Sequence, residues 1–261
     1  MKFSILITSY NKGKFIEEAI KSCIQQTYKD FEIVVMDNES IDHTDVILNK
    51  YSNQISVIKN KRISKYPAVN QIDLIKKGSQ ICSGEIICLL DADDFFNLDK
   101  LEKLKDLFQK DINLEIIFDI PIIRNEKKTK KFFLKKKKSE YIWPTIIPTS
   151  SISIKKNLLK KSLNKILIDK YNYLEIDFRI CVYTQKIIKK FLILDKELTN
   201  YRTVLDGIMA SNKKFSYKWW KKRQEAHNFM FEIYKKNNLD YKINLDYFFT
   251  NMINKFIKTK D

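Results

Sequence analysis

The sequence predicts an α/β fold, in which a mixed, mostly parallel sheet carries helices on both faces and a helical extension follows at the C-terminus. Three observations carry this prediction. Apolar strand-like and helix-like segments alternate through the first 125 residues. The most apolar of these strands, EIICLL, runs directly into Asp91-Ala92-Asp93-Asp94, and open α/β sheets bind ligands at the carboxyl ends of their strands. Two helix-like segments close the chain.

The first half contains four expected strands and three expected helices. The strands cover residues 3–8, 31–37, 55–58 and 85–90, and the helices cover residues 14–26, 42–51 and 67–82. Asp42 is expected to cap the second helix, and Pro67 suits the first turn of the third. Polar or acidic residues follow three of the strands, so we expect them to face one crevice.

The second half is less regular. It is expected to hold a basic hairpin or loop at 127–138, irregular chain around 143–148, a helix at 172–190, a strand at 191–194, irregular chain at 200–214, and helices at 217–237 and 241–258. We therefore expect a main domain over residues 1–214 and a helical extension over residues 215–261.

Composition limits the class of protein. A chain of 261 residues that is 44% apolar can bury a large core. No stretch approaches the roughly 20 apolar residues that span a bilayer, and the start turns polar after eight residues. We expect a cytoplasmic protein with neither signal peptide nor anchor. Its four cysteines lack metal-ligand spacing and are expected to be buried, reduced thiols.

The charge favours anionic partners. A net charge of +17 would attract nucleic acid, lipid headgroups, an acidic glycan or a nucleotide, although lysine is abundant almost everywhere. With four glycines, neither GxGxxG nor GxxxxGK[ST] occurs anywhere in the chain, so a nucleotide must be held by other means.

The acidic cluster at the end of the most apolar strand predicts a metal site. Several adjacent carboxylates repel one another, and a divalent cation bridging them to a diphosphate would relieve that repulsion. Asp91 and Asp93 need not both bind the metal directly, so one can hold a ribose while the other holds the ion. The alternative is a helix start, with Asp94 or Asn97 capping a helix that begins near Leu98.

Several separated motifs, in order, carry a family resemblance. SILITSYNKGKFIEEAIKSCIQQTYKDFEIVVMDNESIDHT, followed by GEIICLLDADDFF, resembles the family 2 glycosyltransferases of the GT-A fold over roughly residues 3–100. The resemblance implies a nucleotide-binding half at 1–100 and an acceptor-binding half at 101–214. It implies that the donor is bound by Thr8, Ser9, Tyr10, Asp37, Asn38, Lys65, Asn70, Asp91, Ala92, Asp93 and Arg202, with Asp93, or Asp91 in its place, on Mg²⁺ or Mn²⁺.

Two positions depart from the family pattern of Asp-Asp-Gly-Ser. Asn38 stands where an aspartate would accept the uracil N3 proton, and its amide offers both an acceptor and donors, so cytosine and guanine stay open beside uracil. Glu39 replaces a glycine, so the turn lacks a residue that easily takes positive φ.

The resemblance also assigns the chemistry of transfer. Transfer needs a general base, and the segment Tyr173-Leu174-Glu175-Ile176-Asp177-Phe178-Arg179 looks like the helix that supplies it, with Asp177 as the base and Glu175 in reserve. Arg179 would position the acceptor or pair with the carboxylate. The Tyr201-Arg202 pair resembles the end of a strand before a closing loop at 203–214, where Arg202 would contact the diphosphate.

We therefore expect an inverting transfer of sugar, most readily from a UDP-sugar, to a glycan or lipid-linked acceptor. The resemblance places such enzymes in the synthesis of bacterial capsule or other surface polysaccharide. Residues 216–223 mix tryptophan with lysine, which suits contact with the inner face of the membrane or packing on the main domain. The alternatives are a nucleotide-sugar-binding module without turnover, a nucleotidyltransferase and a nucleic-acid-binding protein; the last leaves the acidic cluster unexplained.

Overall fold

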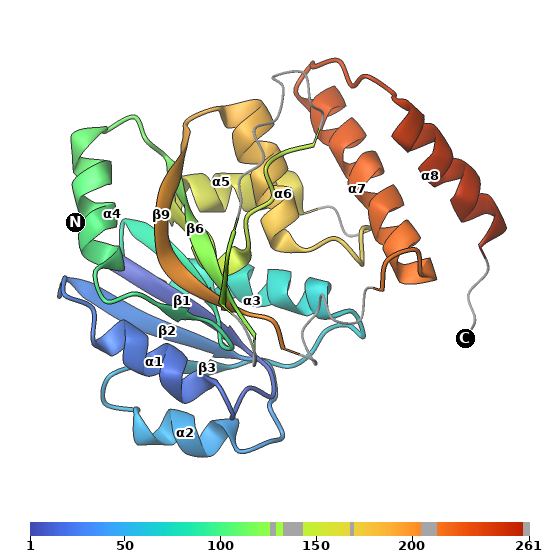
Figure 1. The fold of residues 1–261 in the computed structure, drawn as a ribbon. Helices are drawn as coiled ribbons and strands as arrows, with labels where there is room; N and C mark the ends of the chain where they lie inside the picture. Colours follow the sequence, from blue (N-terminus) through green and yellow to red (C-terminus); the bar gives the residue numbers. More distant parts are fainter. Residues whose placement is uncertain (126–128, 133–142, 168–169, 205–212, 258–261) are drawn as a thin grey trace.

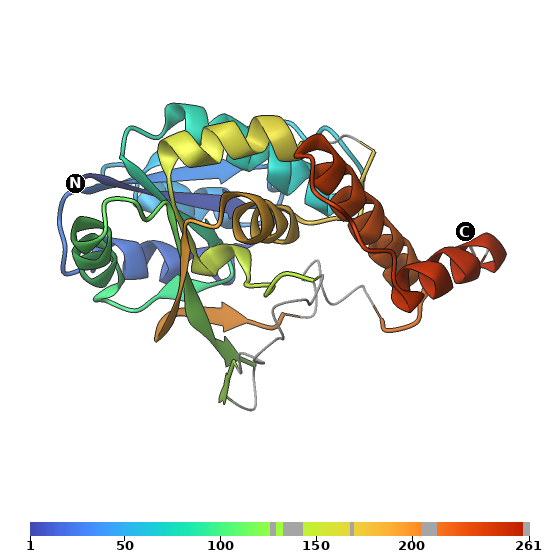
Figure 2. The same cartoon turned by 90° about the horizontal axis from the view of Figure 1, so that it is seen from above.

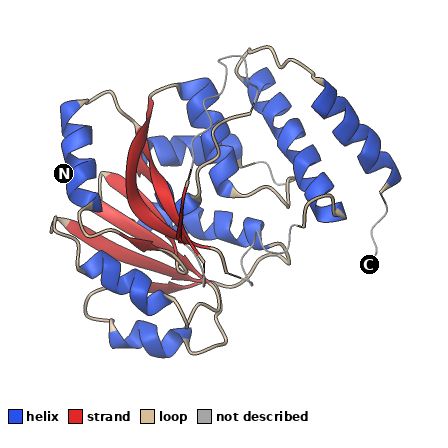
Figure 3. Cartoon of the chain, in the orientation of Figure 1, coloured by secondary structure: helices blue, strands red, loops and turns tan. Residues whose placement is uncertain are grey.

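One sheet forms the centre of the molecule, and helices cover both of its faces (Figure 3). The computed structural model describes residues 1–125, 129–132, 143–167, 170–204 and 213–257. Its elements in chain order (Figure 1) are β1 (Phe3–Ser9), α1 (Ile16–Ile24), β2 (Phe31–Asp37), α2 (Thr44–Lys50), β3 (Ser56–Lys59), α3 (Pro67–Ile81), β4 (Ile86–Asp91), β5 (Phe95–Phe96), α4 (Lys100–Lys110), β6 (Ile116–Arg124), β7 (Thr129–Lys131), the 3₁₀ turn η1 (Thr149–Ser151), β8 (Ile152–Lys155), α5 (Lys156–Ile166), α6 (Ile176–Val182), the π-helical turn η2 (Tyr183–Ile188), β9 (Phe191–Arg202), α7 (Tyr217–Lys236) and α8 (Leu245–Phe256).

The predicted mixed, mostly parallel sheet is confirmed. Its strand order is β3-β2-β1-β4-β8-β6-β9-β5, with β7 paired to β6. The four strands expected from the first half are parallel neighbours. The antiparallel strand β8 joins β4 to β6, and β9 then runs parallel to β6.

Hydrophobic side chains pack on both faces of the sheet, which explains why β1 is buried along its whole length. Leu6 packs with α3, α5 and α6 on one face, whereas its neighbours Ile5 and Ile7 pack with α1, α2 and α4 on the other. Figure 2 separates the two layers, with α3 and α5 above the sheet and α1 and α4 below it.

The second half differs from the prediction in two elements. The helix expected at 172–190 begins only at Ile176, after a turn at 172–173, and its last turn widens into η2. The strand expected at 191–194 continues for twelve residues, to Arg202. A register shift opposite Asp195 and Lys196 bulges this strand, and the charged residues there interrupt the apolar pattern that would have revealed its length.

Two helices follow the main body. Four apolar side chains of α7 complete the core shared by α3, α5 and α6: Ala226, Phe229, Met230 and Ile233. The expected domain boundary at residue 214 stays a prediction. Within the described residues, no helix is both long and apolar enough to cross a membrane.

Candidate active site

The carboxyl ends of β1, β2 and β4 meet at one edge of the sheet. Because β1 lies between the other two, Ser9 stands opposite Asp37 and Thr8 stands opposite Asp91. The Thr8 hydroxyl donates a hydrogen bond of 2.9 Å to Oδ1 of Asp91. The three polar segments that the sequence placed at strand ends therefore lie together.

The turn after β2 is built around Asp37. Its carboxylate accepts hydrogen bonds from the backbone N–H of Ser40 (3.1 Å) and from the Ser40 hydroxyl (2.6 Å). Glu39 takes a φ of 58°, so this turn does require the left-handed backbone that glycine adopts most easily. The Glu39 carboxylate accepts a hydrogen bond of 2.9 Å from the backbone N–H of Arg62, which gives the glutamate a local partner.

Tyr10 follows β1 and is 39% exposed. The Arg62 guanidinium lies over its ring, 4.0 Å from the ring centroid, in a cation–π contact. The sequence named Lys65 as the donor-binding cation of this loop; its ammonium lies 5.5 Å from the Tyr66 ring centroid, and its role toward the donor stays a prediction. Sequence reasoning missed Arg62. It belongs to the basic run KRISK, whose local pattern does not indicate which cation contacts Tyr10.

Asn70 is buried at the start of α3 and binds backbone. Its side-chain oxygen accepts from the N–H groups of Ile63 and Ser64, both at 3.0 Å, and its amide donates to the Ser64 carbonyl at 2.7 Å. In this structure, Asn70 therefore holds the loop that carries Arg62.

The carboxylates of Asp91 and Asp94 are held by short hydrogen bonds. Asp91 accepts a hydrogen bond of 2.7 Å from the Gln71 amide, in addition to that from the hydroxyl at the end of β1. Asp94 accepts from the Ser150 hydroxyl at 2.6 Å and from the backbone N–H of Arg202 at 2.7 Å. A helix does follow this segment, since α4 begins at Lys100, but its N-cap is Asp99 rather than Asp94 or Asn97.

The Ser150 hydroxyl contacts both ends of the acidic segment, because it also accepts a hydrogen bond of 3.0 Å from the backbone N–H of Asp91. Ser150→Ala should lower the free energy of unfolding by about 1–3 kcal/mol, since it leaves buried polar partners unsatisfied. Urea unfolding measures this loss. The control is Ser151→Ala, which should change stability by less than about 0.5 kcal/mol because the Ser151 hydroxyl, although buried, has no hydrogen-bond partner among the described residues. Equal losses in both variants would contradict this role for Ser150.

Asp93 differs from Asp91 and Asp94 because its side-chain partner is a cation. Nζ of Lys12 lies 3.0 Å from its carboxylate. Burial and then the charge of Asp93 raise the pKa of Asp91 to about 6. Burial and the same charge also raise the pKa of Asp94 well above its usual range.

These carboxylates suit a divalent cation, which would relieve their repulsion. Among the described residues, however, no three His, Cys, Asp or Glu side chains form a ready metal-binding group. Mg²⁺ and related ions are commonly held by one or two carboxylates together with substrate phosphates. The donor set therefore fits an ion that arrives with a diphosphate.

Arg202 ends β9 beside the acidic segment. One guanidinium nitrogen donates to the Asp93 carbonyl at 3.0 Å, another pairs with Glu18, and the group lies 4.7 Å from the Phe95 ring centroid. A guanidinium held here can bind a diphosphate by two parallel hydrogen bonds.

Asp177 lies in the second half of the chain, and its charge acts on the same tyrosine, Tyr201, as the charges of the acidic segment. The pKa of Tyr201 is raised by burial and by the charges of Asp94, Asp91, Asp177 and Asp93, in that order. Burial and the charge of Glu175 raise the pKa of Asp177 itself to about 7. The charges of the expected base and of the acidic segment therefore both raise the pKa of the same tyrosine.

Glu175 precedes α6 and turns toward the C-terminal helices, where Oε1 accepts a hydrogen bond of 2.5 Å from Lys222. The charge of Lys222 lowers the pKa of Asp177, so α7 tunes this carboxylate. Arg179 is buried and donates to three backbone carbonyls, including that of Leu174 at 3.1 Å. It supports the loop before α6 and offers no exposed group to an acceptor.

Other expected features are described only in part. The strand β7, at the start of the basic segment, pairs with β6, whereas most of residues 127–138 lie outside the described residues, so the expected hairpin or loop there stays a prediction. Most of the expected closing loop, 203–214, also lies outside them. Trp219 and Trp220 are half-buried and pack edge to face, 4.7 Å apart, at the start of α7.

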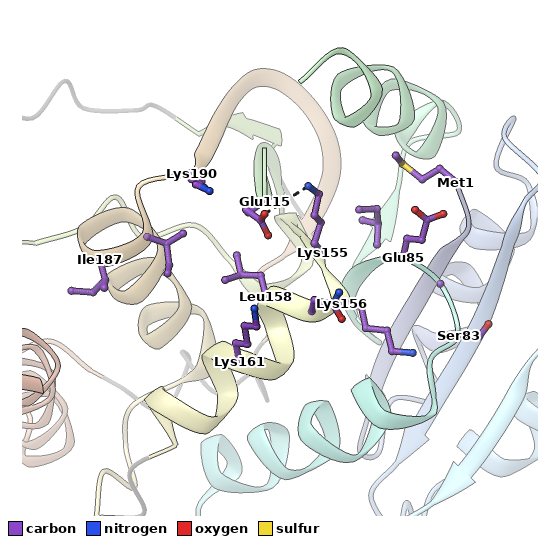
Figure 4. A pocket seen from close by; sticks show the side chains of 14 residues that line it. Met1, Ser83, Glu85, Glu115, Lys155, Lys156, Leu158, Lys161, Ile187 and Lys190 are labelled. Atoms are coloured by element: carbon purple, nitrogen blue, oxygen red, sulfur yellow. Dashed lines mark ion pairs between the residues drawn. The ribbon is translucent and has the colours of Figure 1, made fainter. Parts of the chain in front are cut away.

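A cavity of about 820 Å³ lies away from this site (Figure 4). It is lined by Met1, Gly84 and the first residue of β4, Ile86, and by side chains of α5 that include Lys161. These residues mark the amino ends of the strands, so the cavity is not formed by the residues that the sequence predicted.

The fold and sequence resemble known glycosyltransferases. The pattern of the family described as "Glycosyl transferase family 2" matches residues 4–176. The amylovoran biosynthesis glycosyltransferase AmsB of Erwinia amylovora is 25% identical over 216 residues, 78% of this chain and 70% of AmsB. In two further curated relatives, the chain spans only 39% and 41% of the relative's length.

Two solved structures share the fold. TarS 1-349 of S. aureus, in complex with UDP-GlcNAc, superposes with a TM-score of 0.67 at 19% identity, covering 97% of this chain and 70% of that TarS 1-349 chain. The mannosyltransferase PcManGT of Pyrobaculum calidifontis, in complex with GDP-Man and Mn²⁺, gives a TM-score of 0.55 at 15% identity, covering 96% of this chain and 68% of PcManGT. The expected GT-A architecture is thereby confirmed.

Proposed function

Because this chain belongs to glycosyl transferase family 2, we propose that it transfers a sugar from a nucleotide diphosphate sugar to an acceptor hydroxyl with inversion at the anomeric carbon. The observation that carries this proposal is the cluster that Thr8, Asp37 and Asp91 form at the carboxyl ends of β1, β2 and β4, and the charge of Asp91 also acts on the pKa of Asp177. One carboxylate at the acceptor and a separate acidic segment at the leaving group are what a single displacement requires.

Asp177 acts as the general base. It removes the proton from the acceptor hydroxyl as the oxygen bonds to the anomeric carbon, while the bond from that carbon to the diphosphate breaks and the nucleotide diphosphate leaves. A pKa of about 7 suits this step, because such a carboxylate is ionised in a large fraction of molecules at neutral pH and is still a useful base.

Asp93, with Asp91 in support, would hold the divalent metal, Mn²⁺ or Mg²⁺. When bound, the ion supplies positive charge to the departing diphosphate. Lys12 lies at the same carboxylate and Arg202 lies beside it, so both can bind phosphate oxygens as negative charge develops there.

Tyr10, Arg62 and the Asp37-Asn38 turn form the pocket for the nucleoside. Ring stacking on Tyr10 and hydrogen bonding to the turn suit a planar base and a ribose. Uracil is the proposed base, and the UDP-GlcNAc bound by TarS supports this choice. The GDP-Man and Mn²⁺ bound by PcManGT support the donor class and the metal.

The acceptor is proposed to be a glycan or lipid-linked glycan of the bacterial surface, assembled on the cytoplasmic side of the membrane. The likeness to an enzyme of amylovoran biosynthesis supports a biosynthetic role of this kind. A net charge of +17 favours an acceptor that carries negative charge.

Thermal denaturation with UDP, CDP, GDP and ADP, each with and without Mn²⁺, tests the donor site. A metal-dependent rise in melting temperature with one nucleotide is expected, because a ligand that binds only the folded state stabilises it. The nucleotide that raises the melting temperature identifies the base of the donor. No rise with any nucleotide would overturn the proposed donor site.

Lys222→Met tests the tuning of Asp177 by α7. Loss of this positive charge should raise the pKa of Asp177 further, so the acidic limb of the pH profile of kcat/KM moves to higher pH. Transfer at pH 6.5 is expected to fall about threefold to tenfold, with little change at pH 9. Lys221→Met is the matched control, and a shift of the same size in that variant would rule out a specific effect of Lys222.

A further inference from the structure

The last helix, α8, packs on its neighbour through its polar face and exposes its apolar face, the reverse of an ordinary amphipathic helix. Its polar face points toward α7: Asn251 accepts a hydrogen bond of 2.9 Å from Gln224, and the Asn254 amide donates to the Trp220 carbonyl at 3.0 Å. Thr250 is its one buried residue. A helix that packs on a core normally buries its apolar side chains instead.

The opposite face is an apolar stripe in contact with solvent. Five side chains at helical spacing form it, with exposed fractions of 75%, 61%, 49%, 39% and 79%: Leu245, Phe248, Phe249, Met252 and Phe256. Both views place α8 on the far side of α7 from the sheet (Figures 1 and 2). Nothing in the described part of the chain covers this stripe.

Ion pairs fix the helix in this orientation. Arg223 binds both carboxylate oxygens of Asp246, at 2.9 and 2.6 Å, and His227 lies 3.1 Å from the same carboxylate. The other ring nitrogen of His227 is 2.8 Å from the Tyr241 hydroxyl. Rolling the apolar stripe inward would break this network, so the exposed stripe belongs to the folded state.

The charges around the stripe decide which partner it suits. Asp246 is the only acidic residue within residues 245–256, all of which are described, and it points inward to Arg223. Lys255 is exposed within the stripe, and Lys242 is exposed before its first turn. A chain of net charge +17 repels a second copy of itself and is attracted to a negatively charged surface.

We propose that α8 lies in the surface of an anionic lipid bilayer, with this stripe among the acyl chains and its lysines at the headgroups. Interfacial helices combine an apolar face of Leu and Phe with flanking cations in this way. For residues 216–223 the sequence left membrane contact and packing on the main domain both open; there Trp219 packs against Trp220 and lies under the Arg223 guanidinium. The proposal does not depend on the proposed function, because lipid binding needs neither donor nor acceptor.

Flotation with lipid vesicles tests the proposal on the full chain. Wild-type protein should bind phosphatidylcholine vesicles that contain phosphatidylglycerol, and bind more weakly without that anionic lipid. The double substitution Phe248→Ser and Phe256→Ser should reduce the partition about tenfold or more, because both rings leave water on binding. A second pair, Leu245→Ser with Phe249→Ser, should do the same.

The control is Ile112→Ser, which removes an equally exposed apolar side chain from the main domain and should leave binding unchanged. Circular dichroism establishes that each variant is folded. Unchanged vesicle binding by both stripe variants would overturn the proposal. So would a wild-type dimer in sedimentation analysis that the same substitutions dissociate, because the stripe would then be an interface between copies.

Discussion

Asp93→Ala should abolish metal-dependent nucleotide binding and reduce kcat/KM for transfer by about 10²- to 10³-fold, since it removes the carboxylate proposed to hold the ion at the leaving diphosphate. Its side chain is only 14% exposed and reaches Lys12 rather than backbone. Loss of its charge also relieves the repulsion that raises the pKa of Asp91 and Asp94. The melting temperature without ligand should therefore stay near that of the wild type.

Calorimetric titration with UDP and Mn²⁺, together with initial rates of transfer, measures this effect. Asp106→Ala is the matched control, because it deletes the same charged group from α4 at a site where the side chain is 65% exposed. If the Asp93→Ala variant keeps the wild-type nucleotide affinity and metal dependence, Asp93 does not hold the metal.

Asp177→Asn should reduce transfer by about 10²- to 10⁴-fold, the range expected for loss of a general base. Donor binding should be unchanged, because Asp177 is proposed to act on the acceptor hydroxyl. In the wild type, kcat/KM should fall as pH drops below about 7, because the base is then protonated.

The same substitution makes a prediction about stability. The folded pKa of Asp177, about 7, lies above the ordinary value of 3.8, so between these values the folded state binds more protons than the unfolded state. The carboxylate therefore costs stability progressively as pH rises from about 4 to 7. Asp177→Asn should be more stable than the wild type at pH 8, and thermal melts across this pH range measure the difference.

Glu175→Gln separates the two candidate carboxylates. Removing the Glu175 charge, which raises the pKa of Asp177, should move the acidic limb of the profile to lower pH and leave the maximal rate near that of the wild type. An inactive Glu175→Gln variant beside an active Asp177→Asn variant would assign the base to Glu175.

The sequence by itself determined the architecture of the first half of the chain. Alternating apolar strands and helices are local patterns, and once β1, β2 and β4 are parallel neighbours their carboxyl ends must meet. The proximity of Thr8, Asp37 and Asp91 therefore follows from position along the chain. The family followed as well, since its motifs are short local patterns that occur in order along the chain.

The second half depended on contacts that no local pattern records. The bulge at Asp195 and Lys196 hid the length of β9, and the buried guanidinium of Arg179 serves carbonyls of its own loop. Even α8, whose periodicity is plain in the sequence, carried no sign of which face turns outward. That choice rests on the ion pair between Arg223 and Asp246, which are separated by 22 residues.

Only the tertiary structure decided which cation meets which carboxylate. The chain carries 49 lysines and arginines, and their long side chains reach partners far away in sequence. Lys12 reaches Asp93, Arg62 covers Tyr10, and Lys222 tunes Asp177 from another helix. Strand order follows from hydrogen bonding and burial that repeat along each element. Each of these side-chain pairs depends instead on a single distance, which exists only after the elements have packed.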